Sequence, residues 1–167
     1  LMNAALRLSW YKFKHHYMDF VKVLLGIVAF EGLILYIQDK GFLKDFETTR
    51  MTLFLLLFST SLLIVVQNSI YISKERSVLN RDFFSGLSRS AFALASMGIH
   101  AFFAVLETIV FILSYSVFSK FFDKEFPDAG HIFGSYRWEV GITVLLVFLA
   151  SHFIALFISA LVGKSEI

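Results

Sequence analysis

The chain has 167 residues, of which 57% are hydrophobic and only 17% charged, and its formal net charge is +2. A soluble domain is nearer half apolar and a quarter charged, and one of this size has no interior large enough for 21 phenylalanines, so the composition excludes a small soluble fold. The small net charge gives no support for nucleic-acid binding, and the absence of cysteine excludes disulfides and thiolate metal sites.

An amphipathic segment opens the chain over residues 6–19. Its apolar and aromatic side chains recur at helical spacing: Leu6, Trp10, Phe13 and Tyr17. Arg7 and Lys14 lie on the other side, so the pattern predicts an interfacial helix that leads into a membrane. The alternative is an ordinary juxtamembrane segment without a fixed tilt. The segment is too polar for a cleavable signal peptide, so we expect the first apolar run to be retained as a span.

Four apolar runs then follow, each near the roughly 20 residues that a helix needs to cross a bilayer. They cover residues 20–37, 51–72, 91–118 and 140–162. The runs are continuous rather than alternating, which indicates helices instead of barrel strands. The sequence therefore predicts an all-α, polytopic membrane bundle with four spans, which form a single transmembrane domain.

Basic residues are distributed unevenly between the two sides of these spans. Nine of them fall on the side of the N-terminus: Arg7, Lys12, Lys14, Lys22, Lys74, Arg76, Arg81, Arg89 and Lys164. Six fall on the other side: Lys40, Lys44, Arg50, Lys120, Lys124 and Arg137. Because short cytoplasmic loops are enriched in Lys and Arg, we expect a multi-pass protein of the cell membrane with a cytoplasmic N-terminus.

The segment 73–90 between the second and third spans has an unusual composition. A charged stretch is followed by Phe83, Phe84 and Leu87, and Gly86 permits a sharp turn. These features favour a short amphipathic helix along the membrane surface, which could dock into the groove of a partner. The alternative is a basic inner loop that only fixes the topology.

The spacing of charges in this segment resembles that of a known family. Glu75-Arg76 is followed by Arg81-Asp82 and then by Gly86. This order resembles the membrane domain of type 2 ABC exporters of the ABCG-like class (white/pleiotropic drug resistance), in which the second acidic residue is usually Glu rather than Asp. That family has six spans in each half, so we expect this chain to be one piece of a longer protein.

The resemblance implies a mechanism and a set of partners. A nucleotide-binding domain outside this chain would bind ATP and Mg²⁺, and two transmembrane halves would pair around a substrate path in the lipid bilayer. The residues that would couple the spans to the ATPase are Glu75, Arg76, Arg81, Asp82, Phe83 and Gly86. The chain itself would bind no cofactor. The implied cargo is amphipathic: a peptide, a lipid-like molecule or a drug.

Polar residues inside the spans are the candidates for a substrate path: Glu31, Gln67, Asn68, His100 and Glu107. A carboxylate within a span is costly and must face protein or water, so the two glutamates contact either substrate or protons, or hold helices together. Gln67 and Asn68 either line the inner mouth of a path or cap the second span. His100, like His152, is either a packed or a cavity-lining group.

Small residues recur every four positions on the last span, at Ser151, Ala155, Ser159 and Gly163, which predicts close helix packing within the chain or at a dimer seam. Gly163-Lys164-Ser165 lacks the earlier glycine and the strand of a phosphate-binding loop. No metal-ligand spacing and no nucleophile–base pair is evident, so an enzymatic activity would rely on a partner. The alternatives to an exporter are a four-span scaffold or assembly protein, an ion-coupled carrier using Glu31 and Glu107, and, more weakly, a lipid enzyme.

Overall fold

A computed structural model describes residues 7, 8, 10, 11, 14, 15, 17–38, 45–69, 76–124, 130 and 132–162 of the chain. All the regular structure in these residues is helical. The helices are α2 (Tyr17–Ile37), α3 (Phe46–Asn68), α5 (Arg76–Phe84), α6 (Arg89–Phe121) and α7 (Tyr136–Leu161). The described residues between 7 and 15 are also helical, in agreement with a helical segment before the first span, whereas Leu6 and Phe13 lie outside the described part of the chain.

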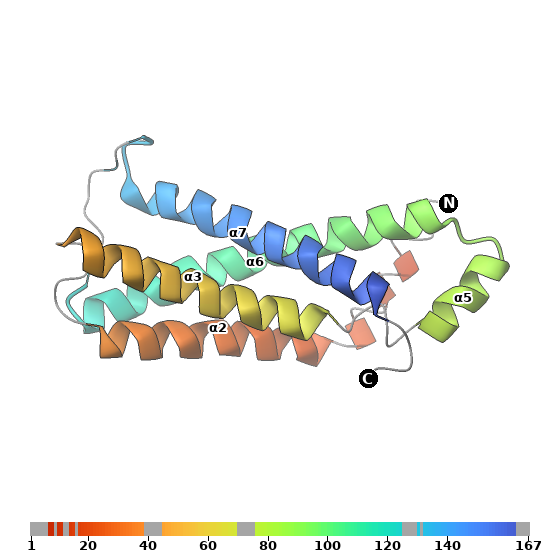
Figure 1. The fold of residues 1–167 in the computed structure, drawn as a ribbon, viewed down its shortest axis with the longest axis horizontal. Helices are drawn as coiled ribbons and strands as arrows, with labels where there is room; N and C mark the ends of the chain where they lie inside the picture. The colour runs from red at the N-terminus through yellow and green to blue at the C-terminus, as the bar shows by residue number, and fades with distance from the viewer. Residues whose placement is uncertain are drawn as a thin grey trace.

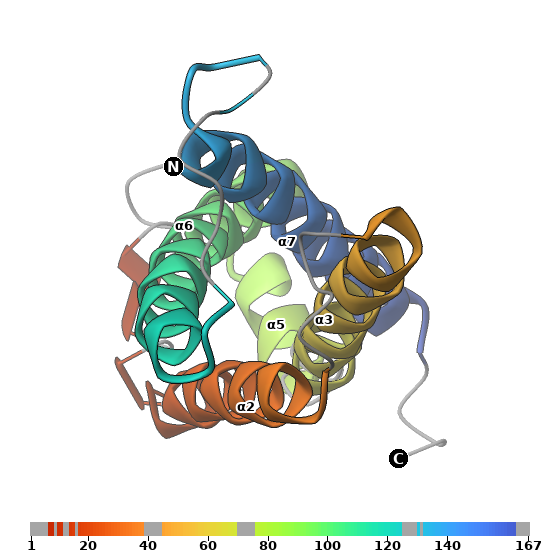
Figure 2. The same ribbon diagram turned by 90° about the vertical axis from the view of Figure 1, so that its left-hand side faces the viewer.

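The four long helices run alternately up and down and form one bundle (Figure 1). Contacts join α2 to α3, α3 to α7, α7 to α6 and α6 back to α2. The view along the bundle shows this closed arrangement, with α5 across its far end (Figure 2). Each of the four is long and apolar enough to span a membrane. The predicted polytopic helical bundle is therefore confirmed.

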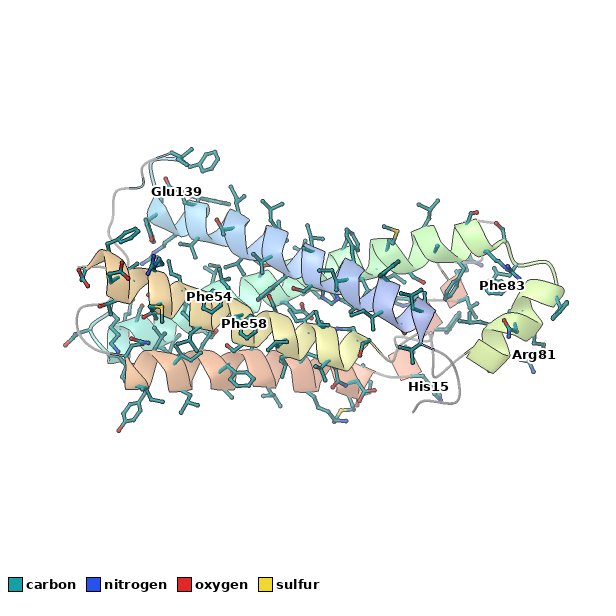
Figure 3. All side chains as sticks on the ribbon, in the orientation of Figure 1. His15, Phe54, Phe58, Arg81, Phe83 and Glu139 are labelled. Atoms are coloured by element: carbon teal, nitrogen blue, oxygen red, sulfur yellow. The ribbon has the colours of Figure 1, made fainter. Side chains whose placement is uncertain are left out.

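The distribution of side chains is that of a membrane protein, because large apolar groups cover the outside. Phe54 and Phe58 stack at 5.4 Å between ring centroids on the exposed surface of α3 (Figure 3). Polar groups such as Thr52, Thr60 and Glu107 are instead buried between the helices. Water does not favour such an arrangement, whereas in a bilayer the polar groups find partners inside the bundle and the apolar ones face lipid.

The helix ends are set by local hydrogen bonds that a hydropathy profile does not register. The Asp45 side chain caps α3 by accepting a hydrogen bond from the Thr48 backbone N–H, so α3 begins five residues before the predicted span. With 33 residues at 1.5 Å each, α6 is about 50 Å long and exceeds the roughly 30 Å of the hydrocarbon core. Figure 1 shows its first turns extending beyond the other three helices, toward α5.

A buried lysine joins two helices at the end of the bundle opposite α5. Lys124, which follows α6, is only 5% exposed, and its Nζ donates to the backbone carbonyls of Leu35 and Gln38. These carbonyls belong to the C-terminal end of α2, where a cation also complements the helix dipole. The Tyr115 hydroxyl donates to the Lys124 carbonyl at 3.1 Å, which fixes the loop that carries the lysine.

Candidate functional site

A rigid turn connects α5 to α6. Gly86 has a φ of +106°, which favours glycine, and its N–H donates to the Phe83 carbonyl at 3.2 Å. The Leu87 N–H donates to the Asp82 carbonyl at 3.0 Å, which completes a Schellman motif at the end of α5. Ser88 then caps α6 through its side chain, which accepts from the Ala91 N–H. The two helices are therefore joined by a short linker whose course is set by these hydrogen bonds.

The inner face of α5 holds it against the start of α6. Leu79 is buried, and Phe83, one turn later, meets the Phe92 ring edge-on at 5.9 Å between centroids. The Arg89 guanidinium lies 5.7 Å from the centre of the Phe83 ring, within the range of a cation–π contact. The Phe83 side chain thus packs inside this chain, where it helps to set the angle of α5.

The outer face of α5 presents an apolar side chain and several polar ones. Phe84 is 94% exposed, the largest exposure of any large hydrophobic residue that the structure describes. Arg81 is also exposed and lies 4.0 Å from the partly buried Asp82, a separation at which an exposed pair contributes little to stability. Figure 3 places Arg81 and Phe83 at the end of the molecule opposite Glu139. An exposed aromatic group on a capped helix is suited to insertion into a partner's pocket.

For two of the predicted coupling residues the structure gives no side-chain position. Glu75 lies outside the described residues, and for Arg76 only the backbone, as the first residue of α5, is described. The predicted coupling role of all six residues stays a prediction, because the structure contains no partner chain.

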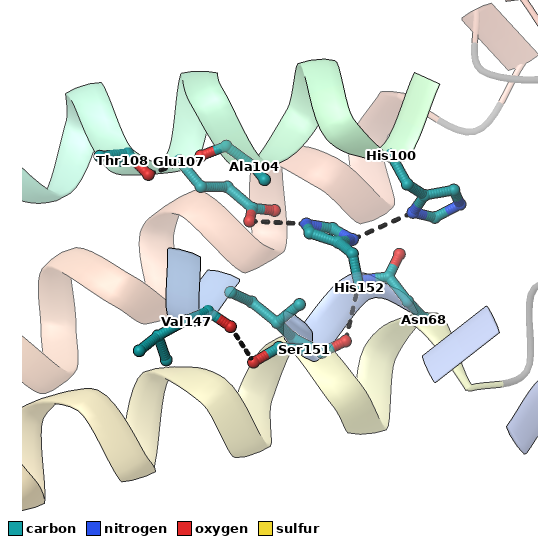
Figure 4. A network of polar contacts seen from close by, with 9 residues as sticks. Asn68, His100, Ala104, Glu107, Thr108, Val147, Ser151 and His152 are labelled. Atoms are coloured by element: carbon teal, nitrogen blue, oxygen red, sulfur yellow. Dashed lines mark hydrogen bonds and ion pairs between the residues drawn. The ribbon is translucent and has the colours of Figure 1, made fainter. Parts of the chain in front are cut away.

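A chain of three buried ionisable side chains lies between α6 and α7 (Figure 4). His152 Nε2 is 2.8 Å from Glu107 Oε2, and His152 Nδ1 is 3.0 Å from His100 Nδ1. Glu107 and His152 are fully buried, and His100 is 1% exposed. His100 and Glu107 are seven residues apart and so share one face of α6, from which both reach the same histidine on α7. The second carboxylate oxygen, Glu107 Oε1, has no hydrogen-bond partner among the described residues.

The other intramembrane carboxylate has a different kind of partner. Glu31 on α2 is fully buried and accepts a hydrogen bond from the Ser114 hydroxyl on α6. Its Oε1 atom also has no hydrogen-bond partner among the described residues. Glu31 therefore contacts a neutral group, whereas Glu107 contacts a base that can accept or share a proton.

The remaining predicted path residues lie at the end of α3. The Asn68 side chain donates to the Ile64 carbonyl of its own helix at 2.8 Å, and Gln67 is half-buried beside it at the end of α3. A groove of about 470 Å³ between α6 and α7 and one of about 270 Å³ near Tyr136 include none of the five candidates in their walls. In this conformation Glu31, His100 and Glu107 contact other buried side chains, and their role in a substrate path stays a prediction.

The small residues of the last span lie on its buried face. Ser151, Ala155 and Ser159 are all buried, and the Ser151 hydroxyl donates to the Val147 carbonyl at 2.8 Å. His152, which is fully buried, directly follows Ser151. Gly163 lies outside the described residues. Three of the four positions are thus buried within the chain, and the packing role of the stripe stays a prediction.

The sequence analysis does not identify three contacts in the structure. They are the contact of His152 with Glu107, that of Ser114 with Glu31, and that of Lys124 with the end of α2. The one usable signal for the first was that His152 is the sole titratable residue of α7 between Glu139 and Leu161, at a depth similar to that of Glu107.

Comparison with protein families gives a match over almost the full length of the chain. The family model described as "ABC-2 type transporter" matches residues 4–167, which include both α5 and the four long helices. No curated protein and no solved structure matches the chain significantly.

Proposed function

Because the chain belongs to the ABC-2 type transporter family, we propose that this ABC transporter membrane subunit works in an ATP-driven exporter in which α5 receives the movement of the motor. ABC-2 membrane domains typically work with a nucleotide-binding ATPase, which here would bind ATP and Mg²⁺. The observation that carries the proposal is the geometry of α5: a helix fixed by the Gly86 turn that exposes Phe84 at the end of the bundle.

The stiffness of the connection supports a mechanical role. Two backbone hydrogen bonds close the end of α5, and the Ser88 cap begins α6 two residues after Gly86. A push on α5 would therefore tilt the long α6 helix instead of being absorbed by a loose linker. Because α6 packs against both α2 and α7, such a tilt would change the packing of the whole bundle.

The charge distribution supports a cytoplasmic position for α5. Arg81 and Arg89 flank the turn, and by the order of the predicted spans nine of the fifteen Lys and Arg residues fall on this side. By the positive-inside rule the N-terminus and α5 then face the cytosol, where an ATPase would be found. We propose the cell membrane as the location on the same grounds.

The cargo and the second half follow from the resemblance noted in the sequence. We propose an amphipathic substrate, such as a peptide, lipid-like molecule or drug, that moves by alternating access between two paired transmembrane halves. The exposed apolar surface of the bundle is compatible with both a second half and lipid as neighbours. The ABCG-like assignment is likewise proposed on the charge spacing around Gly86.

The test is to alter the exposed part of α5 in the transporter assembled with its ATPase. Phe84→Ala and Asp82→Lys should lower ATP-driven export and its coupling to ATP hydrolysis severalfold, while the protein still inserts. Phe133→Ala, at an exposed position at the opposite end of the bundle, is the matched control and should leave both activities unchanged. Full export and ATPase stimulation in both α5 variants would overturn the coupling role of α5. Absence of ATP-driven export in the wild type would favour a non-transporting scaffold, and export driven by an ion gradient without ATP would favour a carrier.

A further inference from the structure

The buried histidines and carboxylate between α6 and α7 have no role in the coupling mechanism. We propose that Glu107, His152 and His100 form a proton-binding site, which holds one exchangeable proton while α6 and α7 are packed together and releases it when they separate. The proposal rests on the two contacts of His152, at 2.8 Å to Glu107 and 3.0 Å to His100, and on the burial of all three side chains.

The hydrogen-bond geometry restricts where protons can reside. The contact between the two Nδ1 atoms needs a hydrogen on one of them and a lone pair on the other. The contact between His152 Nε2 and Glu107 Oε2 needs one hydrogen between nitrogen and oxygen. The hydrogen between the two Nδ1 atoms therefore lies on either His152 or His100, and when it lies on His152 a neutral His100 carries its own hydrogen on Nε2.

One proton makes the site electrically neutral. The proton can lie on Glu107, which then donates to His152 Nε2, or on His152, which then forms an ion pair with the carboxylate. The two forms differ by the transfer of one proton over 2.8 Å. In both, His152 Nδ1–H donates to His100 Nδ1, so His100 carries its own hydrogen on Nε2.

Loss of that proton changes the contact between the helices. The site then has a net charge of −1, with His152 Nε2–H donating to the Glu107 carboxylate. His152 Nδ1 then carries a lone pair and no hydrogen. His100 must therefore move its hydrogen from Nε2 to Nδ1, or the contact is lost. A second added proton would give the site a net charge of +1, and on His100 it would put hydrogens on both Nδ1 atoms and break the contact. One proton is therefore the number at which the packed site is neutral with both contacts made.

The surroundings offer little to compensate a net charge at this depth. Phe103 packs edge-on against His100 at 5.6 Å between ring centroids, and Phe20 of α2 covers Phe103. The other titratable or charged side chains of the packed helices are Tyr17, Asp19, Lys22, Glu31 and Tyr36 on α2, Glu47 and Arg50 on α3, Arg89, Tyr115 and Lys120 on α6, and Tyr136, Arg137 and Glu139 on α7. Glu31 bonds to Ser114, and Asp19 pairs with Lys22 at 3.0 Å. An uncompensated charge is strongly disfavoured in such an interior, so the packed state retains the proton.

Separation of α6 from α7 would admit water and remove this constraint. A hydrated glutamate is ionised near neutral pH, and a hydrated histidine carries a proton only below about pH 6.5. Above that pH the separated state therefore binds one proton fewer than the packed state, and the proton passes to water. By linkage, raising the pH favours separation, by at most about tenfold in the equilibrium constant per pH unit. Near pH 6.5 the two hydrated histidines together hold about one proton, as many as the packed site. Below that pH the separated state binds more protons than the packed state, so a further fall in pH also favours separation.

The first readout is the Nδ1 signal of His100 in the full chain, reconstituted in lipid nanodiscs. Nitrogen NMR of labelled histidine distinguishes an Nδ1 atom that accepts a hydrogen bond inside the protein from one that is hydrated, and His100→Asn identifies the signal. Between about pH 6 and 8, this signal should change from the bonded to the hydrated form in one transition, as the packed state gives way to the separated one. Glu107→Gln should remove this transition. Glu31→Gln, which changes the other buried carboxylate, should leave it intact.

The second readout is the separation of the helices, which the absence of native cysteine makes accessible. Spin labels on Leu94→Cys in α6 and Phe157→Cys in α7, both at exposed positions, report the distance across the site. The population of separated molecules should rise with pH, and Glu107→Gln should abolish the rise. His152→Gln, which keeps a donor toward Glu107, serves as a second variant if Glu107→Gln does not fold.

A His100 Nδ1 signal that does not change with pH would overturn the proposal. So would a pH response that survives Glu107→Gln, or one that Glu31→Gln abolishes equally. No ATPase is present in these measurements, so a negative result refutes the proton site and leaves the proposed coupling role of α5 standing.

Discussion

Replacement of Gly86 by alanine isolates the contribution of the turn between α5 and α6. Gly86 has a φ of +106°, and a Cβ added there would meet nothing within 4 Å, so the substitution introduces strain without a clash. An L-residue in this left-handed region costs about 1–2 kcal/mol. The chain can avoid that cost by opening the turn, which would release the hydrogen bond from the Leu87 N–H to the Asp82 carbonyl and detach α5 from its fixed angle.

Gly98→Ala provides a matched control on α6. A Cβ at Gly98 also meets nothing within 4 Å, but this glycine lies inside the helix and its φ is not in the positive range. Alanine should therefore stabilise the helix by about 0.5–1 kcal/mol. The two alanine variants should differ by about 1.5–3 kcal/mol in favour of Gly98→Ala.

The assay combines unfolding in detergent micelles with ATP-driven export by the assembled transporter. We expect Gly86→Ala to export severalfold less than the wild type and Gly98→Ala to export normally. If Gly86→Ala matched the wild type in both stability and export, the turn would have no mechanical role. Equal loss in the two variants would point to a general sensitivity of α6 instead of a specific role of the turn.

Three further substitutions test other contacts. Lys124→Met leaves two carbonyls at the end of α2 without their donor and should lower the free energy of unfolding by about 2–4 kcal/mol. Lys120 is exposed, so Lys120→Met is the control and should change this free energy by less than about 0.5 kcal/mol. Denaturant titration measures both. Phe83→Ala removes the aromatic and cation–π contacts of α5, worth about 1–2 kcal/mol, and should raise hydrogen exchange across α5 without unfolding the four long helices. Glu107→Ala leaves a buried histidine nitrogen without its partner and should destabilise the fold by about 1–3 kcal/mol, whereas Glu107→Gln, which keeps a hydrogen-bonding group, should cost less in the same titration.

The fold could be predicted from the sequence because length and continuous hydrophobicity suffice to identify a membrane-spanning helix. The helix ends could not, since they depend on hydrogen bonds of single residues. The predicted second span begins only after the charged Glu47 and Arg50. In the structure these two residues pair with each other at 2.7 Å within the first turns of α3. The cap from Asp45 extends the helix in front of them.

The turn at Gly86 was predictable because it is local in sequence: a glycine, a capping serine and two aromatics lie within six residues. The sequence could not show which aromatic faces inward, because that depends on the packing of Phe83 against Phe92. The link from Glu107 to His152 spans 45 residues and exists only because α6 and α7 are neighbours in the bundle.

Photo-crosslinking from α5 tests the central claim most directly. A photoreactive phenylalanine analogue at position 84 would replace a 94% exposed aromatic with one of similar shape, and the same analogue at position 133 would probe the opposite end of the bundle. We predict an adduct with the nucleotide-binding partner from position 84 and none from position 133. An adduct from position 133, or none from position 84 in an assembled and active transporter, would contradict the proposed role of α5.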